Sequence, residues 1–448
     1  MALKIERRIV RVKRHAATAG WLSLLFMGLG QFYNRQIGKG IFFLAIHVTG
    51  ILLLITKLST HIVGFITLGD QGQQLVKVGK IYKNVPGDHS IFMMIYGLVA
   101  IFIVLIHIIF YVMSIRDAVL TGRLREKGKK LPNFKQSLRN IFNNNFAYLL
   151  LALPIAGVLM FTILPIIFTA LIAFTNYSSP NNIPPKNLVD WVGLGTFKNL
   201  FGMEAWSNTF VGVASWTFVW AVLATFTCYF GGILVALLIN QKGIRFKGVW
   251  RMIFIIPYAI PQFVSLLIMR NILNDKFGPL NQYFRYFGLD GLPWLNDPFW
   301  AKFSVIMVNM WLGIPVTMVL VMGILTNIPK DLYEAADVDG ATPGAKFRNI
   351  TMPFVLFATA PILITQFAGN INNFNVIYLL TKGAPSRVDY NNAGATDLLV
   401  TWLYKLTLDF NKYNMASAVS ILIFIVIATL SILFYRRSRS FREEDMIQ

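Results

Sequence analysis

The chain has 448 residues, of which 56% are hydrophobic and only 14% are charged, whereas charged residues make up about 25% of an average soluble domain. Apolar runs of 17 to 30 residues recur along it, which is typical of an all-α polytopic membrane protein. The net charge of +21 could suggest a nucleic-acid partner, but the 41 Lys and Arg and the 20 Asp and Glu lie in loops and at the ends of the runs. Because burying charge in hydrocarbon is costly, these positions indicate a membrane protein and no nucleic acid.

The cysteine and histidine residues give no indication of a metal or catalytic site. Cys228, the one cysteine, lies inside an apolar run, which excludes disulfides and a thiolate cluster and favours an inert buried thiol. His47 and His107 have no Cys, Asp or Glu at ligand spacing, so we expect them to pack or to hydrogen-bond between helices. The sequence contains no recognisable catalytic triad and no Gly-x-x-x-x-Gly-Lys-Ser/Thr loop to hold phosphates. We therefore expect no catalytic residue, no metal and no cofactor on this chain, and ATP hydrolysis only on a separate chain.

Nine apolar runs are candidates for membrane spans, and the first, 17–33, differs from the others. The remaining eight cover 40–58, 91–113, 147–175, 209–239, 252–273, 303–326, 357–380 and 415–435. Short basic loops mark the cytoplasmic side, and loops 114–146 and 240–251 carry eight and four Lys or Arg. The first run would reach only about 26 Å of the roughly 30 Å hydrocarbon core, and its crossing would place the basic N-terminus outside. We therefore predict an interfacial or re-entrant first segment, eight transmembrane helices, and both termini in the cytoplasm.

These runs and loops divide the chain into five expected parts. They are the basic N-terminus with the interfacial or re-entrant segment (1–39), two extra N-terminal helices (40–113), a basic cytoplasmic linker (114–145), a six-helix core (146–435) and a cytoplasmic tail (436–448). Pro257, Pro261 and Pro315 fall in helices of the core, where each removes a backbone donor and bends the helix. Ordinary packing kinks and helices shaped around a cavity explain these prolines about equally well.

A polar loop, 327–356, separates two long apolar runs. Pro329 stops the preceding helix, and Asp331 followed by Glu334 has the spacing of a capping box. We expect a short helix from Leu332 to Val338, ended by Gly340, and a second helix from Pro343 to Ile350. Such a pair would form a knob projecting into the cytoplasm. From spacing alone, a structured loop without a special function is an equal alternative.

Six residues of this loop carry a resemblance to a known family. They are Glu334, Ala335, Ala336, Gly340, Ile350 and Pro353. Their spacing resembles, position for position, the EAA loop of ABC importer permeases. In that family the loop forms a coupling helix that docks in a cleft of the cytoplasmic ATPase and transmits its motion on ATP binding. The resemblance therefore implies an ATPase-coupling role for these residues.

Further segments resemble the maltose permease subunit called MalF, most strongly from about 146 to 435. They are residues 258–261, 309–315, 370–374 and 379–385. The resemblance implies a type I, MalF-like permease fold. This chain departs from it in the segment 17–33 and in the loop 176–208, which is short where the enterobacterial subunit has a large external domain.

Uncharged amides gather inside the apolar run 357–380, at Gln366, Asn370, Asn372, Asn373 and Asn375. An amide in hydrocarbon is costly unless it faces a cavity or another helix, and Asn370 and Asn373 share a helix face with Gln366. Amides donate and accept hydrogen bonds, which suits sugar hydroxyls. Nearby aromatic rings could pack on pyranose rings; these are Trp311, Phe367, Phe374 and Tyr378. On chemistry alone, hydrogen bonding between helices is slightly favoured over a sugar site.

The resemblance adds a sugar site to this picture. In the maltose permease, sugar contacts come from positions that match Asn309, Leu312, Gly313, Asn370 and Asn373 here. Two aromatic contacts match Val316 and Gly369, and Gln366 stands in place of a serine. The smaller side chains imply a larger cavity and an oligosaccharide cargo longer than maltose, with maltodextrin as the first candidate. A galacto- or arabino-oligosaccharide is the alternative cargo.

The resemblance also implies the partners of this chain. They are a second, MalG-like permease subunit, two ATPase subunits that bind the ATP, and an extracytoplasmic sugar-binding protein, assembled in a bacterial cell membrane. An ion-coupled secondary transporter is a competing class, but such proteins usually place ionisable residues at the membrane midplane. The expected spans hold amides and no Asp, Glu, Lys or Arg in their middles. A membrane enzyme or scaffold is a third class, against which the missing nucleophile–base pair argues.

Overall fold

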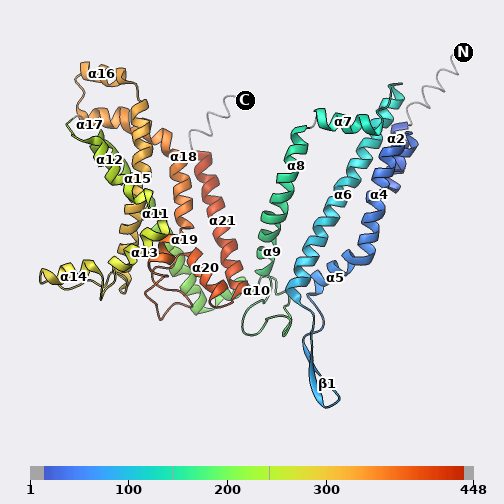
Figure 1. Ribbon diagram of the computed structural model, residues 1–448, viewed down its shortest axis with the longest axis horizontal. Coiled ribbons are helices and arrows are strands. Elements are labelled where there is room, and N and C mark those ends of the chain that lie inside the picture. The colour runs from blue at the N-terminus through green and yellow to red at the C-terminus, as the bar shows by residue number, and fades with distance from the viewer. Residues whose placement is uncertain (1–14, 145, 242, 438–448) are drawn as a thin grey trace. The chain divides into compact units, whose positions relative to one another are not determined.

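The computed structural model describes residues 15–144, 146–241 and 243–437. Its contacts divide the chain into two compact units, Met1–Val192 and Gly193–Gln448. Both are helical, and the described part of the first also contains a two-stranded sheet (Figure 1). Among the described residues, seven helices are long and apolar enough to cross a membrane, or up to eight if one bent pair counts as a span. The predicted all-α polytopic fold with about eight transmembrane helices is confirmed.

Three of the spans belong to the N-terminal unit. They are α6 (Ser90–Glu126), the stretch α4 (Ile37–Leu53), η1 (Leu54–Leu58) and α5 (Ser59–Thr67), and the stretch α8 (Phe146–Val158), η2 (Leu159–Ile163) and α9 (Leu164–Ile172). The helix that ends at Thr67 continues beyond the predicted run 40–58, so Lys57 lies inside a span, where no charge was expected. Lys57 is exposed, and its long stem lets the ammonium reach toward the membrane surface.

The first apolar segment forms two short helices that pack closely against each other. α2 (His15–Leu25) and α3 (Leu29–Tyr33) are joined by a turn in which Gly28 has a φ of 98°, a conformation that glycine adopts without steric cost. A Cβ on Gly30 would lie 2.2 Å from the carbonyl oxygen of Ala19 and 2.8 Å from the Cβ of Ala118 on α6. Within the described residues, neither helix is long enough to cross about 30 Å of hydrocarbon.

His47 on α4 and His107 on α6 meet between the two helices. Nδ1 of His47 and Nε2 of His107 lie 3.4 Å apart, and the rings stack with centroids 5.5 Å apart. The hydrogen bond expected between helices is confirmed for this pair.

The contacts group the helical stretch Phe146–Ile172 with the N-terminal unit, whereas the sequence groups it with the six-helix core. α7 (Phe134–Asn144) lies in the expected linker 114–145. Residues 1–14 of the basic N-terminus and 438–448 of the tail lie outside the described residues. The five-part division of the chain stays a prediction.

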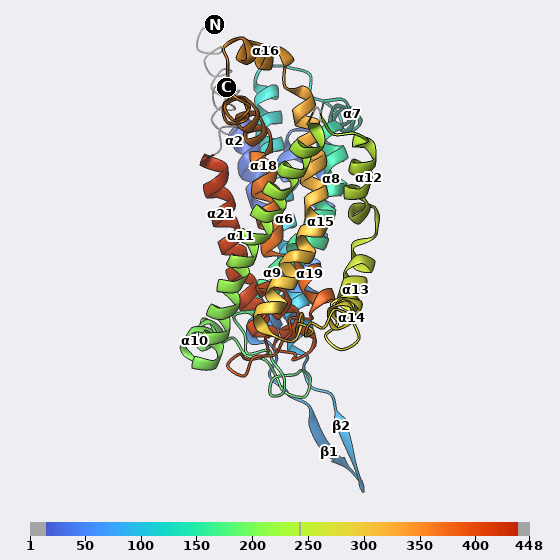
Figure 2. The ribbon, with the colours of Figure 1, turned by 90° about the vertical axis from the view of Figure 1, so that its left-hand side faces the viewer.

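The other spans belong to the C-terminal unit. They are α11 (Glu204–Asn240), the bent pair α12 (Lys247–Ala259) and α13 (Gln262–Ile272), α15 (Pro298–Asn327), the stretch α17 (Pro343–Lys346), η3 (Phe347–Thr351), α18 (Met352–Ile371) and α19 (Phe374–Leu380), and α21 (Tyr413–Arg437). The shorter helices are α10 (Gly195–Gly202), α14 (Pro279–Tyr286), α16 (Lys330–Val338) and α20 (Leu399–Leu408). Helices α10, α14 and α20 lie at one end of this unit, and α16 and α17 lie at the other (Figures 1 and 2).

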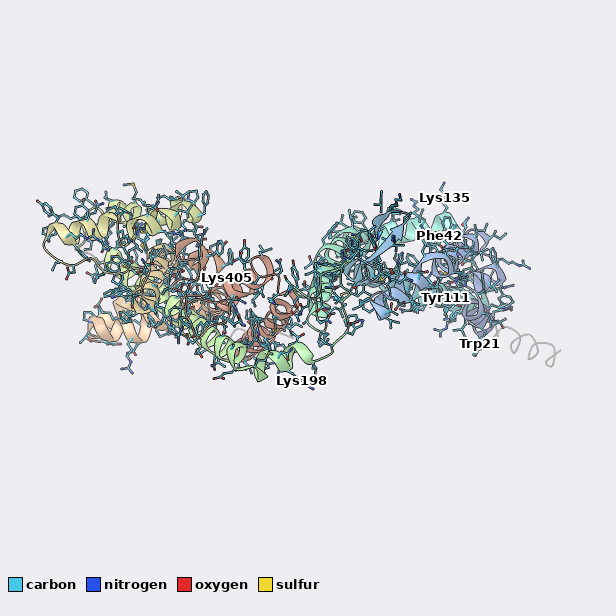
Figure 3. The ribbon with its side chains drawn as sticks, turned by 90° about the horizontal axis from the view of Figure 1, so that it is seen from below. Trp21, Phe42, Tyr111, Lys135, Lys198 and Lys405 are labelled. Atoms are coloured by element: carbon cyan, nitrogen blue, oxygen red, sulfur yellow. The ribbon has the colours of Figure 1, made fainter. Side chains whose placement is uncertain are left out.

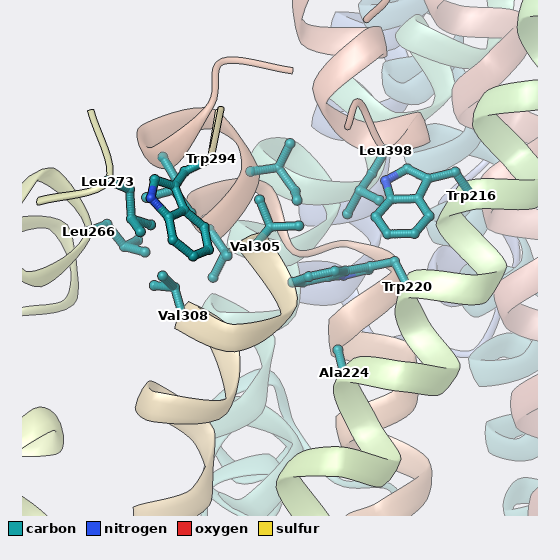
Figure 4. Packing of buried hydrophobic residues seen from close by; sticks show 12 residues of the cluster. Trp216, Trp220, Ala224, Leu266, Leu273, Trp294, Val305, Val308 and Leu398 are labelled. Carbon is teal, nitrogen blue, oxygen red and sulfur yellow. The ribbon is translucent and has the colours of Figure 1, made fainter. Parts of the chain in front are cut away.

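A buried hydrophobic cluster joins α11, α13, α15 and α19 within the C-terminal unit. Its members include Trp216, Trp220, Leu266, Leu273, Trp294, Val305, Val308 and Leu398 (Figure 4). Trp220 is fully buried, and truncation of such a side chain typically costs about 3–5 kcal/mol. Farther along the chain from this cluster, α11 and α15 also approach closely. A Cβ on Gly232 of α11 would lie only 2.5 Å from the Cβ of Thr317 on α15.

A buried ion pair organises the loop between α19 and α20. The carboxylate of Asp397 is fully buried and accepts hydrogen bonds from Lys405 Nζ at 2.6 Å, Thr401 Oγ1 at 2.8 Å and Gly394 N at 2.7 Å. Burial raises the pKa of the Asp397 carboxyl above its ordinary value, and the Lys405 ammonium and the hydrogen bonds oppose that rise. Lys405 lies among the helices of the C-terminal unit (Figure 3). The pair therefore holds the loop in one conformation at this end of the unit.

The close approach of α11 and α15 can be tested with Gly232→Leu. The added side chain would collide with Thr317, and such overpacking typically costs about 1–3 kcal/mol, so the thermal unfolding midpoint in detergent should fall by several degrees. Gly323→Leu is the matched control, because a Cβ on Gly323 of α15 would meet no atom within 4 Å. Equal midpoints for the two variants would contradict the packing described here.

Candidate functional site

The run of amides coincides with a break between two helices. α18 ends at Ile371 and α19 begins at Phe374, so the apolar run 357–380 is not one uninterrupted helix. Asn373 is the N-cap of α19, and its side-chain oxygen accepts a hydrogen bond from the backbone N–H of Val376 at 3.3 Å. Asparagine is among the preferred N-cap residues because its side chain satisfies such a free donor. The break therefore follows from the residues that occupy it.

Three of the predicted site residues lie together at this break. Nδ2 of Asn373 makes long hydrogen bonds to Oδ1 of Asn370 at 3.4 Å and to Oδ1 of Asn309 on α15 at 3.5 Å. Nδ2 of Asn370 donates to Thr225 Oγ1 on α11 at 2.9 Å, and Nδ2 of Asn309 lies 3.4 Å from Cys228 Sγ. These contacts join helices, but each amide can make up to about four hydrogen bonds. The cluster therefore keeps hydrogen-bonding capacity for a ligand.

A cavity of about 440 Å³ opens where α12 and α13 bend by 94°. It is lined by Pro257, Tyr258, Ala259, Ile260, Pro261, Gln262, Leu312 and Val316. Tyr258 is 68% exposed and Val316 is 44% exposed, and a volume of a few hundred Å³ is typical of small-molecule sites. Of the two explanations for the prolines in α12 and α13, the bend around a cavity is favoured. Pro315, by contrast, lies inside α15, which stays continuous.

The remaining predicted residues lie on the helices around the cluster and the cavity. Nε2 of Gln366 on α18 donates to Thr317 Oγ1 of α15 at 3.5 Å. A Cβ on Gly369 would meet no atom within 4 Å, whereas a Cβ on Gly313 would lie 2.5 Å from Cys228 Sγ. Gly369 thus borders open space, and Gly313 lets α15 approach α11.

Residues that sequence reasoning did not assign to the site also lie at the cavity or contact the amides. Tyr258 and Gln262 line the cavity, and Gln262 Oε1 accepts a hydrogen bond from Nδ2 of Asn375 at 3.3 Å, which connects the cavity wall to α19. Thr225 and Cys228 on α11 contact the amides. The paired prolines were the available signal for the first two residues, and nothing in the sequence pattern singled out the α11 residues.

Three of the four aromatic rings expected to pack on a sugar contact other aromatic rings of the protein. Phe374 and Tyr378 stack with centroids 4.8 Å apart, and each lies 4.9 Å from the ring of Tyr404. Phe367 packs edge-on against Phe218 at 6.4 Å. Tyr258 is the aromatic ring that lines the cavity.

The first half of the loop 327–356, the expected coupling loop, is the helix α16, which begins at Lys330 with Pro329 as its N-cap. The expected capping box is wrong, because no side chain caps this helix and Asp331 lies in its first turn. A carboxylate there is still favourable next to the helix N-terminus. The predicted end at Gly340 is confirmed, since α16 ends at Val338, Asp339 is its C-cap, and Gly340 follows with a φ of 70°. Glu334, Ala335 and Gly340 are exposed and Ala336 is half-buried.

The second half of the loop is the beginning of a membrane span. Thr342 caps α17 by accepting a hydrogen bond from the N–H of Ala345 at 3.2 Å, and the helix continues through η3 into α18. The expected separate helix Pro343–Ile350 is therefore wrong, and the knob is α16 resting on the end of a longer helix. Tyr333 OH lies 2.8 Å from Thr351 Oγ1, and Lys346 forms an ion pair with Asp337. Ile350 is half-buried and Pro353 exposed.

Comparison with known proteins identifies the class. Residues 228–440 match the family described as "Binding-protein-dependent transport system inner membrane component". The galactooligosaccharides transport system permease protein GanP of Bacillus subtilis is 39% identical over 96% of this chain and 100% of its own length. The maltodextrin transport system permease protein MalC of Streptococcus pneumoniae is 37% identical over 97% of this chain and 98% of its own.

A solved structure supports the fold. It is a bacterial ABC transporter involved in the import of the acidic polysaccharide alginate, one chain of which superimposes with a TM-score of 0.56 at 24% identity. The superposition covers 68% of this chain and 98% of that one.

The chain belongs to the family of inner-membrane permease components of binding-protein-dependent ABC transporters. The resemblance to MalF-type permeases is confirmed, although MalF itself matches only part of the chain. Members of this family are multi-pass transport subunits, not enzymes, and carry no cofactor; they work with an ATPase and a binding protein. Among the described residues, no group of three or more His, Cys, Asp or Glu could hold a metal ion.

Cysteine labelling tests the cavity without knowledge of the cargo. A small water-soluble maleimide should label Val316→Cys roughly tenfold faster or more than the native Cys228, because labelling requires water at the thiol. Cys228 is 5% exposed between α11 and α15. Val321→Cys is the matched control on the same helix, since Val321 is fully buried. Mass spectrometry of the purified protein gives the rates, and equal rates for the two variants would contradict a water-accessible cavity.

Proposed function

We propose that this chain is a permease subunit for a neutral oligosaccharide, with maltodextrin as the first candidate cargo. The observation that carries the proposal is the pairing of an uncharged cavity with the amide cluster around Asn309, Asn370 and Asn373. Amides match the donors and acceptors of sugar hydroxyls, and the ring of Tyr258 can pack on the apolar face of a pyranose. All eight residues that line the cavity are uncharged. A neutral saccharide therefore fits it better than an acidic one.

The openness around the cluster supports a cargo longer than maltose. Val316 is partly exposed toward the cavity and Gly369 has open space where a side chain would be. In the maltose permease both matching positions are aromatic by the resemblance stated above. Loss of two rings leaves room for further sugar units.

Galactooligosaccharide is the second candidate. The relative named for galactooligosaccharides is 39% identical to this chain, and the relatives named for maltodextrin are 37% identical. This small difference does not separate the two cargoes. Both are neutral, so both satisfy the chemistry of the cavity.

The proposed assembly contains this chain, a second MalG-like permease subunit, two ATPase subunits and an extracytoplasmic sugar-binding protein. The basic loops 114–146 and 240–251 favour the cytoplasm, which leaves both termini on that side. Within the C-terminal unit, α16 lies at the same end as the start of α12 (Figure 1), where Arg245, Lys247 and Arg251 gather. This arrangement supports α16 as the coupling helix that enters the ATPase cleft.

The proposed mechanism is alternating access driven by this helix. α17, η3 and α18 run from the coupling loop to the amide cluster as one helical rod of about 40 Å. When the ATPase displaces α16, the displacement is transmitted to the rod through the contacts of Asp337 with Lys346 and of Tyr333 with Thr351. Movement of the rod would change the accessibility of the amide cluster from the cytoplasmic side of the membrane to the external side.

The cargo is tested with the complex reconstituted together with its partner subunits and binding protein. We expect maltotriose and longer maltodextrins to stimulate ATP hydrolysis, and an acidic oligosaccharide to have no effect. Stimulation by galactooligosaccharides alone would select the second candidate, and stimulation by maltose alone would contradict a longer cargo. Stimulation by the acidic sugar alone would overturn the proposal.

The amide cluster is tested with Asn373→Ser by measuring sugar uptake into vesicles that contain the reconstituted complex. Serine keeps the N-cap but removes the amide donor, so uptake should fall about tenfold or more, the loss expected for one hydrogen bond of about 1.4 kcal/mol. Asn372→Ser is the control, because Asn372 is exposed next to the same break. Wild-type uptake in Asn373→Ser would remove this residue from the site.

The coupling role is tested with Glu334→Lys and Gly340→Pro. Proline fixes φ near about −65°, which is incompatible with the φ of 70° at Gly340, so α16 should lose its position. We expect assembled complexes that no longer take up sugar. Gly340→Asn is the matched control, because asparagine tolerates the left-handed conformation, and it should transport normally. Wild-type uptake in both test variants would contradict the coupling role of this loop.

A further inference from the structure

A β-hairpin projects from the end of the N-terminal unit. It consists of β1 (Gln74–Val78) and β2 (Ile81–Val85), paired antiparallel from Gln74 opposite Val85 to Val78 opposite Ile81. It follows α5 and lies at the end opposite α7 (Figures 1 and 2). All ten strand residues are exposed. We call residues 74–85 the arm.

The base of the arm is firmly held although its strands are uncovered. Oδ2 of Asp88 accepts hydrogen bonds from the backbone N–H of Asp70 at 2.9 Å and of Gln71 at 3.0 Å. The N–H of Gln73 donates to the carbonyl of Pro185 at 3.1 Å. These hydrogen bonds therefore fix the direction in which the arm leaves the helices.

One face of the arm is apolar. Because side chains alternate along a strand, the register places Val76, Val78, Ile81 and Val85 on one face together with Gln74 and Lys83. Val78 is 61% exposed and Ile81 is 74% exposed. A two-stranded hairpin is marginally stable in water on its own, and uncovered apolar strands tend to be contact surfaces. The exposed apolar side chains of the arm are therefore typical of a surface that a binding partner covers.

The arm is also strongly basic. Lys77, Lys80 and Lys83 lie on it, and the sequence has no Asp or Glu between Asp70 and Asp88. The main basic cluster of this unit lies at the other end of α6, around Arg123 and Arg125, which places the arm on the outer side by the positive-inside rule. Three lysines in a short outer loop run against that rule. They are best explained by attraction to an acidic partner.

We propose that the arm is a docking surface for the extracytoplasmic binding protein, and that it contacts an acidic surface with an apolar centre. The proposal rests on the proposed function, because it needs the sugar-binding protein as partner. Transporters of this family depend on such a protein, and the loop 176–208 of this chain is too short to form an external domain for it. A contact as small as the arm is typical of transient complexes, which suits a partner that must leave after each delivery.

The experiment measures the binding-protein concentration that gives half-maximal ATP hydrolysis in the reconstituted complex. The probe is the sugar-loaded binding protein that stimulates the wild type. For Lys77→Glu combined with Lys80→Glu and Lys83→Glu, we expect this concentration to rise about tenfold or more, since reversed charges lose electrostatic steering. The hydrolysis rate without binding protein should be unchanged. In the wild type the same concentration should rise with salt, because salt screens exposed charges.

Two controls separate docking from a structural role. Arginine at the three lysine positions keeps the charge and should behave as the wild type. Val78→Ser on the apolar face should weaken stimulation, whereas Leu75→Ser on the opposite face should not, although both residues are exposed strand positions. Equal effects of the two serine variants would overturn the docking face.

The outcomes distinguish this proposal from the proposed function. If the wild type is stimulated and the glutamate variant has the same half-maximal concentration, the arm is not the docking surface, and a lipid surface or a second copy becomes its occupant. If no sugar-loaded binding protein stimulates the wild type, the proposed function fails and the docking proposal fails with it.

Discussion

Polar groups inside a membrane must find hydrogen-bond partners within the protein, and the break between α18 and α19 meets this demand with the residues of the site itself. Asn373 caps the new helix through Val376. Trp220 Nε1 donates at 3.0 Å to the carbonyl of Asn370 at the end of α18, which also accepts the N–H of Asn373 at 3.2 Å. The same amides that permit the break are held against α11 and α15 by the contacts of Asn370 with Thr225 and of Asn373 with Asn309. The proposed cargo site therefore uses the same asparagines that the break between the helices requires.

The proposed cargo site and the proposed ATPase contact lie at the two ends of one helical stretch. The rod formed by α17, η3 and α18 begins at the cap residue Thr342 and ends beside Asn372. α16 is fastened to its start by the hydroxyl pair Tyr333–Thr351 and the ion pair of Asp337 with Lys346. A rigid helix transmits displacement along its length without any special pathway of side chains. In the proposed mechanism, the loop outside the bilayer acts on the site inside it through this helical stretch.

Much of this architecture could be predicted from the sequence, because hydropathy and charge report membrane spans directly. The eight runs were predictable in this way, and the amides of 357–380 stood out as polar residues in an apolar context. The helix ended by Gly340 was predictable from its proline and glycine punctuation. Tertiary geometry was not predictable. The 94° bend depends on how α12 and α13 pack, and the contacts of Thr225 and Cys228 with the amides depend on the approach of α11 to α15. The Asp397–Lys405 pair had no recognisable sequence signature. In the sequence, the two residues of a buried ion pair look the same as two separate charged residues on the surface.

The central claim is that the amide cluster and the cavity at the α12–α13 bend form one cargo site. A structure of the assembled transporter with a maltodextrin bound tests it most directly. The account predicts sugar density against Tyr258 and Val316, within hydrogen-bond distance of at least one of Asn309, Asn370 and Asn373. Sugar density bounded by other helices, with these three amides bonded only to one another, would contradict it.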